Sequence, residues 1–143
     1  MEIENKIQFL DGAMGTQLQD KGLPAGASPE LFMMEHGEII EDVHAAYIDS
    51  GSDIIYTNTF GANAKKLCKS QYTVEEVITR AVQLAKSAAK RRNGVQVAYI
   101  VLHPAGDMKA GFQLLFKLQS GIFRNIIIGI LNTSLFRINH PCC

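Results

Sequence analysis

Two short apolar stretches of this chain stop abruptly at small and polar residues, and this pattern restricts the folds that the chain can adopt. Residues 7–10 read as a strand that ends at Asp11 and Gly12, and residues 53–56 read as a second strand with polar residues directly after it. A glycine after a carboxylate lets the backbone approach a ligand closely. Parallel α/β enzymes build their sites at such strand ends, so the pattern predicts an α/β protein with a site there.

The second strand is followed by Thr57, Asn58 and Thr59, which place three short hydrogen-bonding side chains at the same level. These side chains fit two roles equally. They can line a binding site and fix its loops, or they can satisfy backbone groups at the end of a strand.

Helical patterns separate the predicted strands. Ser28 is a good N-cap for a first helix, and apolar spacing predicts a second helix over residues 38–50. The clearest helix covers residues 74–92, where Thr73 and Glu76 form a capping box ahead of one apolar stripe.

A third strand is predicted over residues 95–102, which alternate and are rich in β-branched side chains. The resulting order of strand, helices, strand, helices, strand indicates repeated βα units with parallel pairing. This pattern fits an open doubly wound sheet and a barrel alike.

Composition excludes several classes of protein. The chain has 143 residues, of which 47% are apolar and 20% charged, as in one globular domain. Its formal net charge is zero, which argues against nucleic acid or an anionic membrane as partner. Residues 1–6 carry acids and no apolar signal-peptide core, and no apolar run reaches membrane length, so a cytoplasmic protein is expected. Three cysteines do not suggest a disulfide framework.

The charge is divided unevenly along the chain. Residues 1–107 contain all 14 acids and 10 of the 14 Lys and Arg, a net charge of −4. Residues 108–143 contain no acid and four basic residues, a net charge of +4. The chain is therefore divided at residue 107, with a tail of unknown role after it.

Two motifs resemble the homocysteine S-methyltransferase family, in particular the homocysteine-binding barrel of cobalamin-dependent methionine synthase. They are Leu-Asp-Gly-Ala-Met-Gly-Thr at residues 10–16 and Thr-Asn-Thr-Phe-Gly-Ala-Asn at residues 57–63. The resemblance covers roughly residues 7–92 and implies a TIM (β/α)₈ barrel, of which residues 1–107 hold about three βα units of eight. A sheet of three strands cannot close, so a sheet face and an edge are expected to be exposed.

The resemblance also implies a function, which is methyl transfer to the thiol of homocysteine to give methionine. It implies that Asp11 and Gly12 hold the amino-acid end of homocysteine, and a carboxylate makes a strong, directional hydrogen bond to an ammonium group. The competing interpretation is that Asp11 caps the next helical turn. Thr57, Asn58 and Thr59 are expected to line the same mouth.

The resemblance implies cofactors for the parent enzyme, and of these zinc is not expected to be bound by this chain. The family holds zinc with three cysteine thiolates, one after a Gly-x-Asn turn and an adjacent pair after two glycines. Neither motif is present: Cys68 is expected on a helix, and Cys142 and Cys143 follow a proline. We therefore expect zinc in the full-length family but no metal ligand and no catalytic residue here. Cobalamin and methyltetrahydrofolate supply the methyl group in the parent enzyme.

The resemblance weakens at the third strand. Residues 103–106 read His-Pro-Ala-Gly where the family has Gly-Pro-Thr-Gly, and nothing after Asp107 matches. The hypothesis is a truncated, inactive methyltransferase fragment whose tail of residues 108–143 comes from a disrupted reading frame or from a divergent splice or fragment end. The alternative is a non-catalytic half-barrel that works by association with itself or with another chain.

Three further residues are interpreted as structural. Glu30 is a helix-start acid, Met33 fills the core, and His44 is a packed or surface histidine rather than a ligand.

Overall fold

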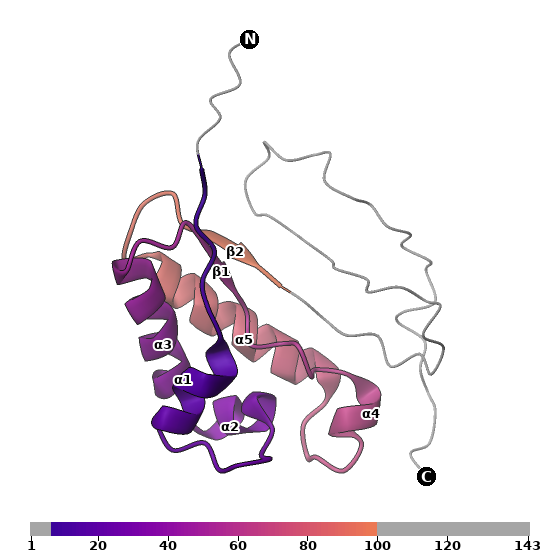
Figure 1. Cartoon of the computed structure of the whole chain (residues 1–143). Helices are drawn as coiled ribbons and strands as arrows, with labels where there is room; N and C mark the ends of the chain where they lie inside the picture. The colour runs from indigo at the N-terminus through magenta and orange to yellow at the C-terminus, as the bar shows by residue number, and fades with distance from the viewer. Residues whose placement is uncertain (1–6, 100–143) are drawn as a thin grey trace, which may run out of the picture.

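The computed structural model describes residues 7–99, which form an α/β arrangement (Figure 1). The predicted tail, the boundary at residue 107 and the cysteines at 142 and 143 lie outside the described residues. The helices are α1 (Met14–Asp20), α2 (Pro29–Glu35), α3 (Gly37–Asp49), α4 (Ala64–Leu67) and α5 (Val74–Ala89). The strands are β1 (Ile54–Tyr56) and β2 (Gln96–Ala98).

The two strands are parallel, which confirms the predicted βα order. Ile54 pairs with Gln96 and Tyr56 with Ala98. The predicted first strand is reduced to one parallel bridge between Leu10 and Ile54. The predicted third strand is present as β2, which leaves out residues 95 and 99 of the expected range, and residues 100–102 lie outside the described residues.

The helices follow their local signals closely. The Thr73 and Glu76 capping box is present at the start of α5, although α5 ends at Ala89, three residues earlier than predicted. α3 ends before Gly51, whose φ of 109° is a conformation that favours glycine. α1 was not predicted, because it is short and has no capping side chain. Within residues 7–99 no helix is long and apolar enough to cross a membrane.

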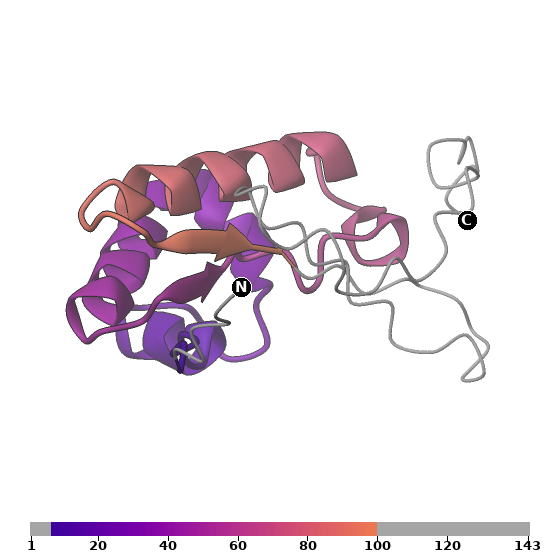
Figure 2. The same ribbon diagram turned by 90° about the horizontal axis from the view of Figure 1, so that it is seen from above.

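The core lies between helices and between helices and sheet. α3 and α5 pack against each other, and α5 crosses one face of the strands (Figures 1 and 2). One group of buried side chains joins the helices and includes Leu18, Met33 and Val77, so the prediction for Met33 is confirmed. A second group joins α3 and α5 to the sheet through Ile55 and Val97.

The segment before α1 leaves large apolar side chains uncovered. Ile7 is 77% exposed, Phe9 63% and Leu10 53%. Burial of such side chains normally stabilises a fold, so this segment offers an apolar surface.

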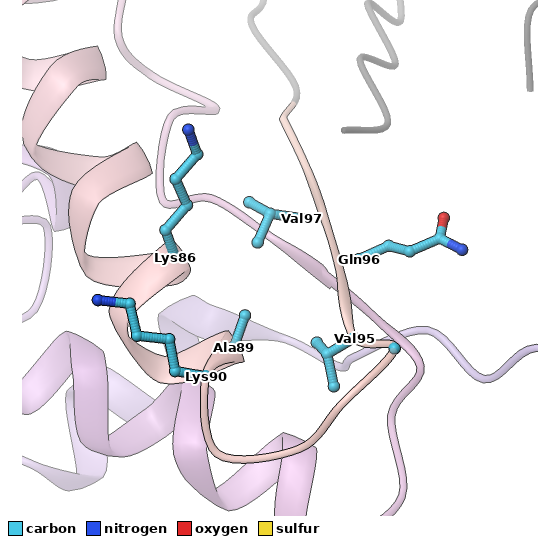
Figure 3. Close-up of a pocket in the computed structure, with 7 residues that line it drawn as sticks. Lys86, Ala89, Lys90, Val95, Gln96 and Val97 are labelled. Atoms are coloured by element: carbon cyan, nitrogen blue, oxygen red, sulfur yellow. The ribbon is translucent and has the colours of Figure 1, made fainter. Parts of the chain in front are cut away.

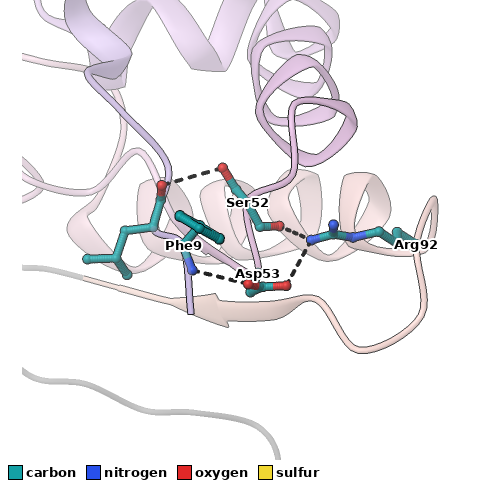
Figure 4. A network of polar contacts seen from close by, with 5 residues as sticks. Phe9, Ser52, Asp53 and Arg92 are labelled. Atoms are coloured by element: carbon teal, nitrogen blue, oxygen red, sulfur yellow. Dashed lines mark hydrogen bonds and ion pairs between the residues drawn. The ribbon is translucent and has the colours of Figure 1, made fainter. Parts of the chain in front are cut away.

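A polar network fastens this segment to the start of β1 (Figure 4). The Asp53 carboxylate accepts a hydrogen bond of 3.1 Å from the backbone N–H of Phe9. Arg92, on the loop before β2, lies 3.3 Å from the other Asp53 oxygen and also donates to the Ser52 carbonyl. The network therefore sets the position of the residues that lead to Asp11.

Candidate functional site

Asp11 lies where the first segment meets the carboxyl end of β1. Its Oδ2 atom accepts a hydrogen bond of 2.9 Å from the backbone N–H of Tyr56, and its own N–H donates to the Ile54 carbonyl at 3.0 Å. Its Oδ1 atom is shielded from solvent and has no hydrogen-bond partner among residues 7–99. Such an atom is a free acceptor for a charged donor.

The environment of Asp11 changes its acidity. Burial raises the pKa of the Asp11 carboxyl to about 6, although the hydrogen bond from Tyr56 acts in the opposite direction. The carboxyl is thus mostly ionised at neutral pH and becomes protonated in mild acid.

Asp11 does not cap the next helix, so that competing interpretation is wrong. The N-cap of α1 is Ala13, and this helix has no side-chain cap hydrogen bond within residues 7–99. The Asp11 carboxylate joins β1 instead. The long-range contact leaves one oxygen available to a ligand.

Gly12 is required by the close approach of Tyr47 from α3. A Cβ atom on Gly12 would lie 2.9 Å from the Tyr47 Oη atom, a distance that real Cβ atoms essentially never show, and 3.0 Å from its Cε1 atom, so Tyr47 would have to shift. The Tyr47 hydroxyl donates to the Ala13 carbonyl at 3.1 Å. Burial, assisted by the Asp11 charge, raises the pKa of the Tyr47 and Tyr56 hydroxyls, so both keep their protons at neutral pH.

The three polar residues after β1 lie where the sequence predicts, and all three are buried. The hydroxyl oxygens of Thr57 and Thr59 are 2.9 Å apart. The Asn58 side-chain amide donates to the Pro29 carbonyl at 2.8 Å, so Asn58 satisfies a backbone group of α2. Asn58 therefore fixes the loop against α2, and the hydroxyls of Thr57 and Thr59 are hydrogen-bonded to each other.

Glu30 is a residue that sequence reasoning missed. The side chain is only 4% exposed, and its Oε1 atom accepts a hydrogen bond of 2.5 Å from the backbone N–H of Gly61. Its Oε2 atom accepts a hydrogen bond of 2.7 Å from the Ser28 hydroxyl. Its position in the first turn of α2 agrees with the prediction of a helix-start acid, but its burial against Gly61 depends on a contact between distant residues that the sequence does not show.

The remaining candidates for metal binding do not form a site. His44 is fully buried, and neither ring nitrogen has a partner among the described residues, which confirms a packed histidine. Burial lowers the pKa of His44 to about 4. Cys68 is exposed, and within residues 7–99 no three His, Cys, Asp or Glu side chains could share a metal. The described residues therefore do not fit a zinc site.

A hollow of about 520 Å³ lies elsewhere, between the end of α5 and β2 (Figure 3). Lys86 and Lys90 contribute to one side, and Val95, Gln96 and Val97 to the other. The hollow lies where α5 leads into β2, at the amino end of that strand. It is therefore separate from Asp11, which lies at the carboxyl end of the strands.

Comparisons with known proteins agree on one relationship. The family model described as homocysteine S-methyltransferase matches residues 8–117. Methionine synthases from Mycobacterium leprae and Mycobacterium tuberculosis are each 30% identical to this chain over 95 residues, which is 62% of this chain and 8% of the relative.

Solved structures of the homocysteine methyltransferase MmuM from Escherichia coli have a similar fold. The metallated form matches with a TM-score of 0.61 at 24% identity, and the oxidized form with 0.61 at 25% identity. Each match covers 68% of this chain and 38% of MmuM. The chain thus spans a minor part of the length of these relatives.

Proposed function

Since the chain belongs to the homocysteine S-methyltransferase family, we propose that its described residues form the part of a homocysteine-binding barrel that holds the amino-acid end of the substrate. The observation that carries this proposal is the Oδ1 atom of Asp11, which is shielded from solvent and has no partner among residues 7–99. The ammonium group of homocysteine is a donor of opposite charge, and such a hydrogen bond is stronger than a neutral one.

The neighbouring residues support this role in different ways. Because Gly12 has no Cβ atom, its backbone can lie close to the Tyr47 side chain. The hydroxyl pair of Thr57 and Thr59 stands directly beyond β1, next to the strand residue that binds Asp11. Asn58 holds this loop against α2.

Activation of the thiol is a separate requirement. A thiol is a poor nucleophile until it loses its proton, and the residues described here include no group that could hold a metal for this purpose. We assign no step of the reaction to a metal on these residues. We propose that the chain by itself binds homocysteine without turnover, and that zinc, cobalamin and methyltetrahydrofolate act in the complete enzymes of the family.

Calorimetric titration of the whole chain with L-homocysteine under reducing conditions tests the proposal. The matched control ligand is 4-mercaptobutanoate, which keeps the thiol and the carboxylate but lacks the amino group. We expect saturable binding of homocysteine, with the control at least about tenfold weaker because it loses a charged hydrogen bond. Equal affinity for both ligands would remove the role of Asp11, and no binding of either would overturn the proposal.

A second candidate function is self-association without catalysis. Three exposed apolar side chains on one short segment, Ile7, Phe9 and Leu10, favour it. A second copy of the chain would bury this surface. Sedimentation over a wide range of concentrations should then show a mass that rises with concentration, and Phe9→Ser should weaken the rise. A monomer at every concentration would reject this function.

A further inference from the structure

We propose that Glu30 is a positioning residue that holds the loop of residues 57–63 in the shape needed to present Thr57 and Thr59 beside Asp11. The inference rests on the proposed function, because the loop matters only if the site binds homocysteine. It adds a residue on a different element, 31 positions before its partner Gly61.

The contact between Glu30 and Gly61 is short and buried. The hydrogen bond from the Gly61 N–H to Oε1 is 2.5 Å, and Gly61 itself is buried. A hydrogen bond to an ionised acceptor is stronger than one to a neutral acceptor. No salt bridge within residues 7–99 involves Glu30, and its two oxygens accept hydrogen bonds from the Gly61 N–H and the Ser28 hydroxyl.

The fit at Gly61 also requires the absence of a side chain. A Cβ atom on Gly61 would lie 2.7 Å from Oε1 and 2.8 Å from Oε2 of Glu30. Real Cβ atoms essentially never come so close. The carboxylate and the glycine therefore fit together as a pair.

The loop has a second attachment to the same helix, and the helix is itself fixed. Asn58 donates to the Pro29 carbonyl, one residue before Glu30. α2 is anchored by Met33, which is fully buried in the core, and by the Ser28 cap. The start of α2 thus holds the loop at two points, and the two threonines lie on either side of Asn58.

The experiment combines amide hydrogen exchange with homocysteine titration on the full chain. The variants are Glu30→Ala, Glu30→Gln, Gly61→Ala and the double variant Glu30→Ala/Gly61→Ala. Glu38→Ala is the matched control, because Glu38 is an exposed acid in the first turn of the next helix. Amides of α5 provide the reference for global opening.

We expect Glu30→Ala to speed exchange of the Gly61 amide and to weaken homocysteine binding, each by about tenfold or more, since a charged hydrogen bond is lost. Glu30→Gln keeps one acceptor oxygen for the Gly61 N–H, while its amide NH2 group can only donate toward the Ser28 hydroxyl, and this variant should restore most of the affinity. Gly61→Ala should cause a similar loss in the wild-type chain but little further loss beside Glu30→Ala, because the clash is gone.

Three outcomes would overturn the inference. Glu30→Ala could match Glu38→Ala in both measurements, or it could speed exchange equally in α5, which would indicate a global role. The effects of Gly61→Ala and Glu30→Ala could also be additive. Failure of the proposed function is distinct, because the wild-type chain would then not bind homocysteine, while the exchange data would still show whether Glu30 holds the loop.

Discussion

The Asp11 carboxylate accepts a hydrogen bond of 2.9 Å from the backbone N–H of Tyr56, a residue 45 positions further along the chain. This contact ties the end of the first apolar segment to the carboxyl end of β1. It uses one carboxylate oxygen and leaves the other without a partner among residues 7–99. The candidate site is thus assembled from two segments that are distant in sequence.

The acidity of Asp11 predicts how homocysteine binding depends on pH. Because burial raises the pKa of Asp11 to about 6, the carboxyl gains a proton as the pH falls through that value. The charged acceptor is then lost, so affinity should decrease below about pH 6 and stay nearly constant above pH 7. Titrations across this range check the expectation. Asp11→Asn should bind weakly at every pH, whereas Asp42→Asn, on an exposed part of α3, should behave like the wild type.

Burial of His44 is expected to make the folded chain less stable in acid. Its pKa is lowered from 6.5 to about 4 in the folded chain, so below pH 6.5 the unfolded state binds the proton more readily. Proton uptake by His44 in the unfolded state has almost no influence above pH 7. As the pH falls from 7 to 5, it lowers the free energy of unfolding by about 2 kcal/mol. Urea unfolding of the wild type and of His44→Leu at both values should show this difference.

The wild type must be compared with His44→Leu because protonation of Asp11 changes the free energy of unfolding in the opposite direction. Its raised pKa means that the folded state gains stability as the pH falls from about 6 toward 3.8. Asp11 is present in both proteins, so its contribution cancels in the difference. An unchanged difference between pH 7 and pH 5 would contradict the role assigned to His44.

Arg92 and its neighbour Arg91 are expected to contribute differently to the stability of the folded chain. Arg92 donates to the Ser52 carbonyl and lies beside Asp53, whose carboxylate binds the backbone of Phe9. Arg92→Met should therefore lower the free energy of unfolding by about 1 kcal/mol. Arg91 pairs with Asp49 at the surface, where the two side chains are 54% and 58% exposed. Arg91→Met should change stability by less than about 0.5 kcal/mol, and equal effects would argue against the network.

Because Thr73 caps α5, its replacement by alanine is expected to lower the free energy of unfolding. The Thr73 hydroxyl accepts a hydrogen bond of 3.2 Å from the Glu76 N–H, which Thr73→Ala removes. We expect a loss of about 1 kcal/mol in urea unfolding. Thr79→Ala, at an exposed position within the same helix, should be neutral or slightly stabilising, because alanine favours helix. The same loss at both positions would mean that the cap contributes nothing specific.

Features that depend only on neighbouring residues could be predicted without the structure. The capping box at Thr73, the N-cap at Ser28 and the helix end before Gly51 are local signals, and the structure confirms each of them. The placement of Thr57 at the end of β1, and of Asp11 directly after the first apolar segment and beside that strand, was also predictable, since apolar runs followed by polar residues mark where such strands stop.

Tertiary structure decided what depends on contacts between distant residues. From the sequence, Glu30 is interpreted only as a helix-start acid, and its contact with Gly61 appears in the fold alone; the competing interpretation of Asp11 as a helix cap is decided by the hydrogen bond from Tyr56. The first apolar segment reads as a strand, yet it forms only one bridge, at Leu10. Local patterns report the preferences of the backbone. The burial of a charge and the choice of a hydrogen-bond partner depend instead on which remote segments fold against it.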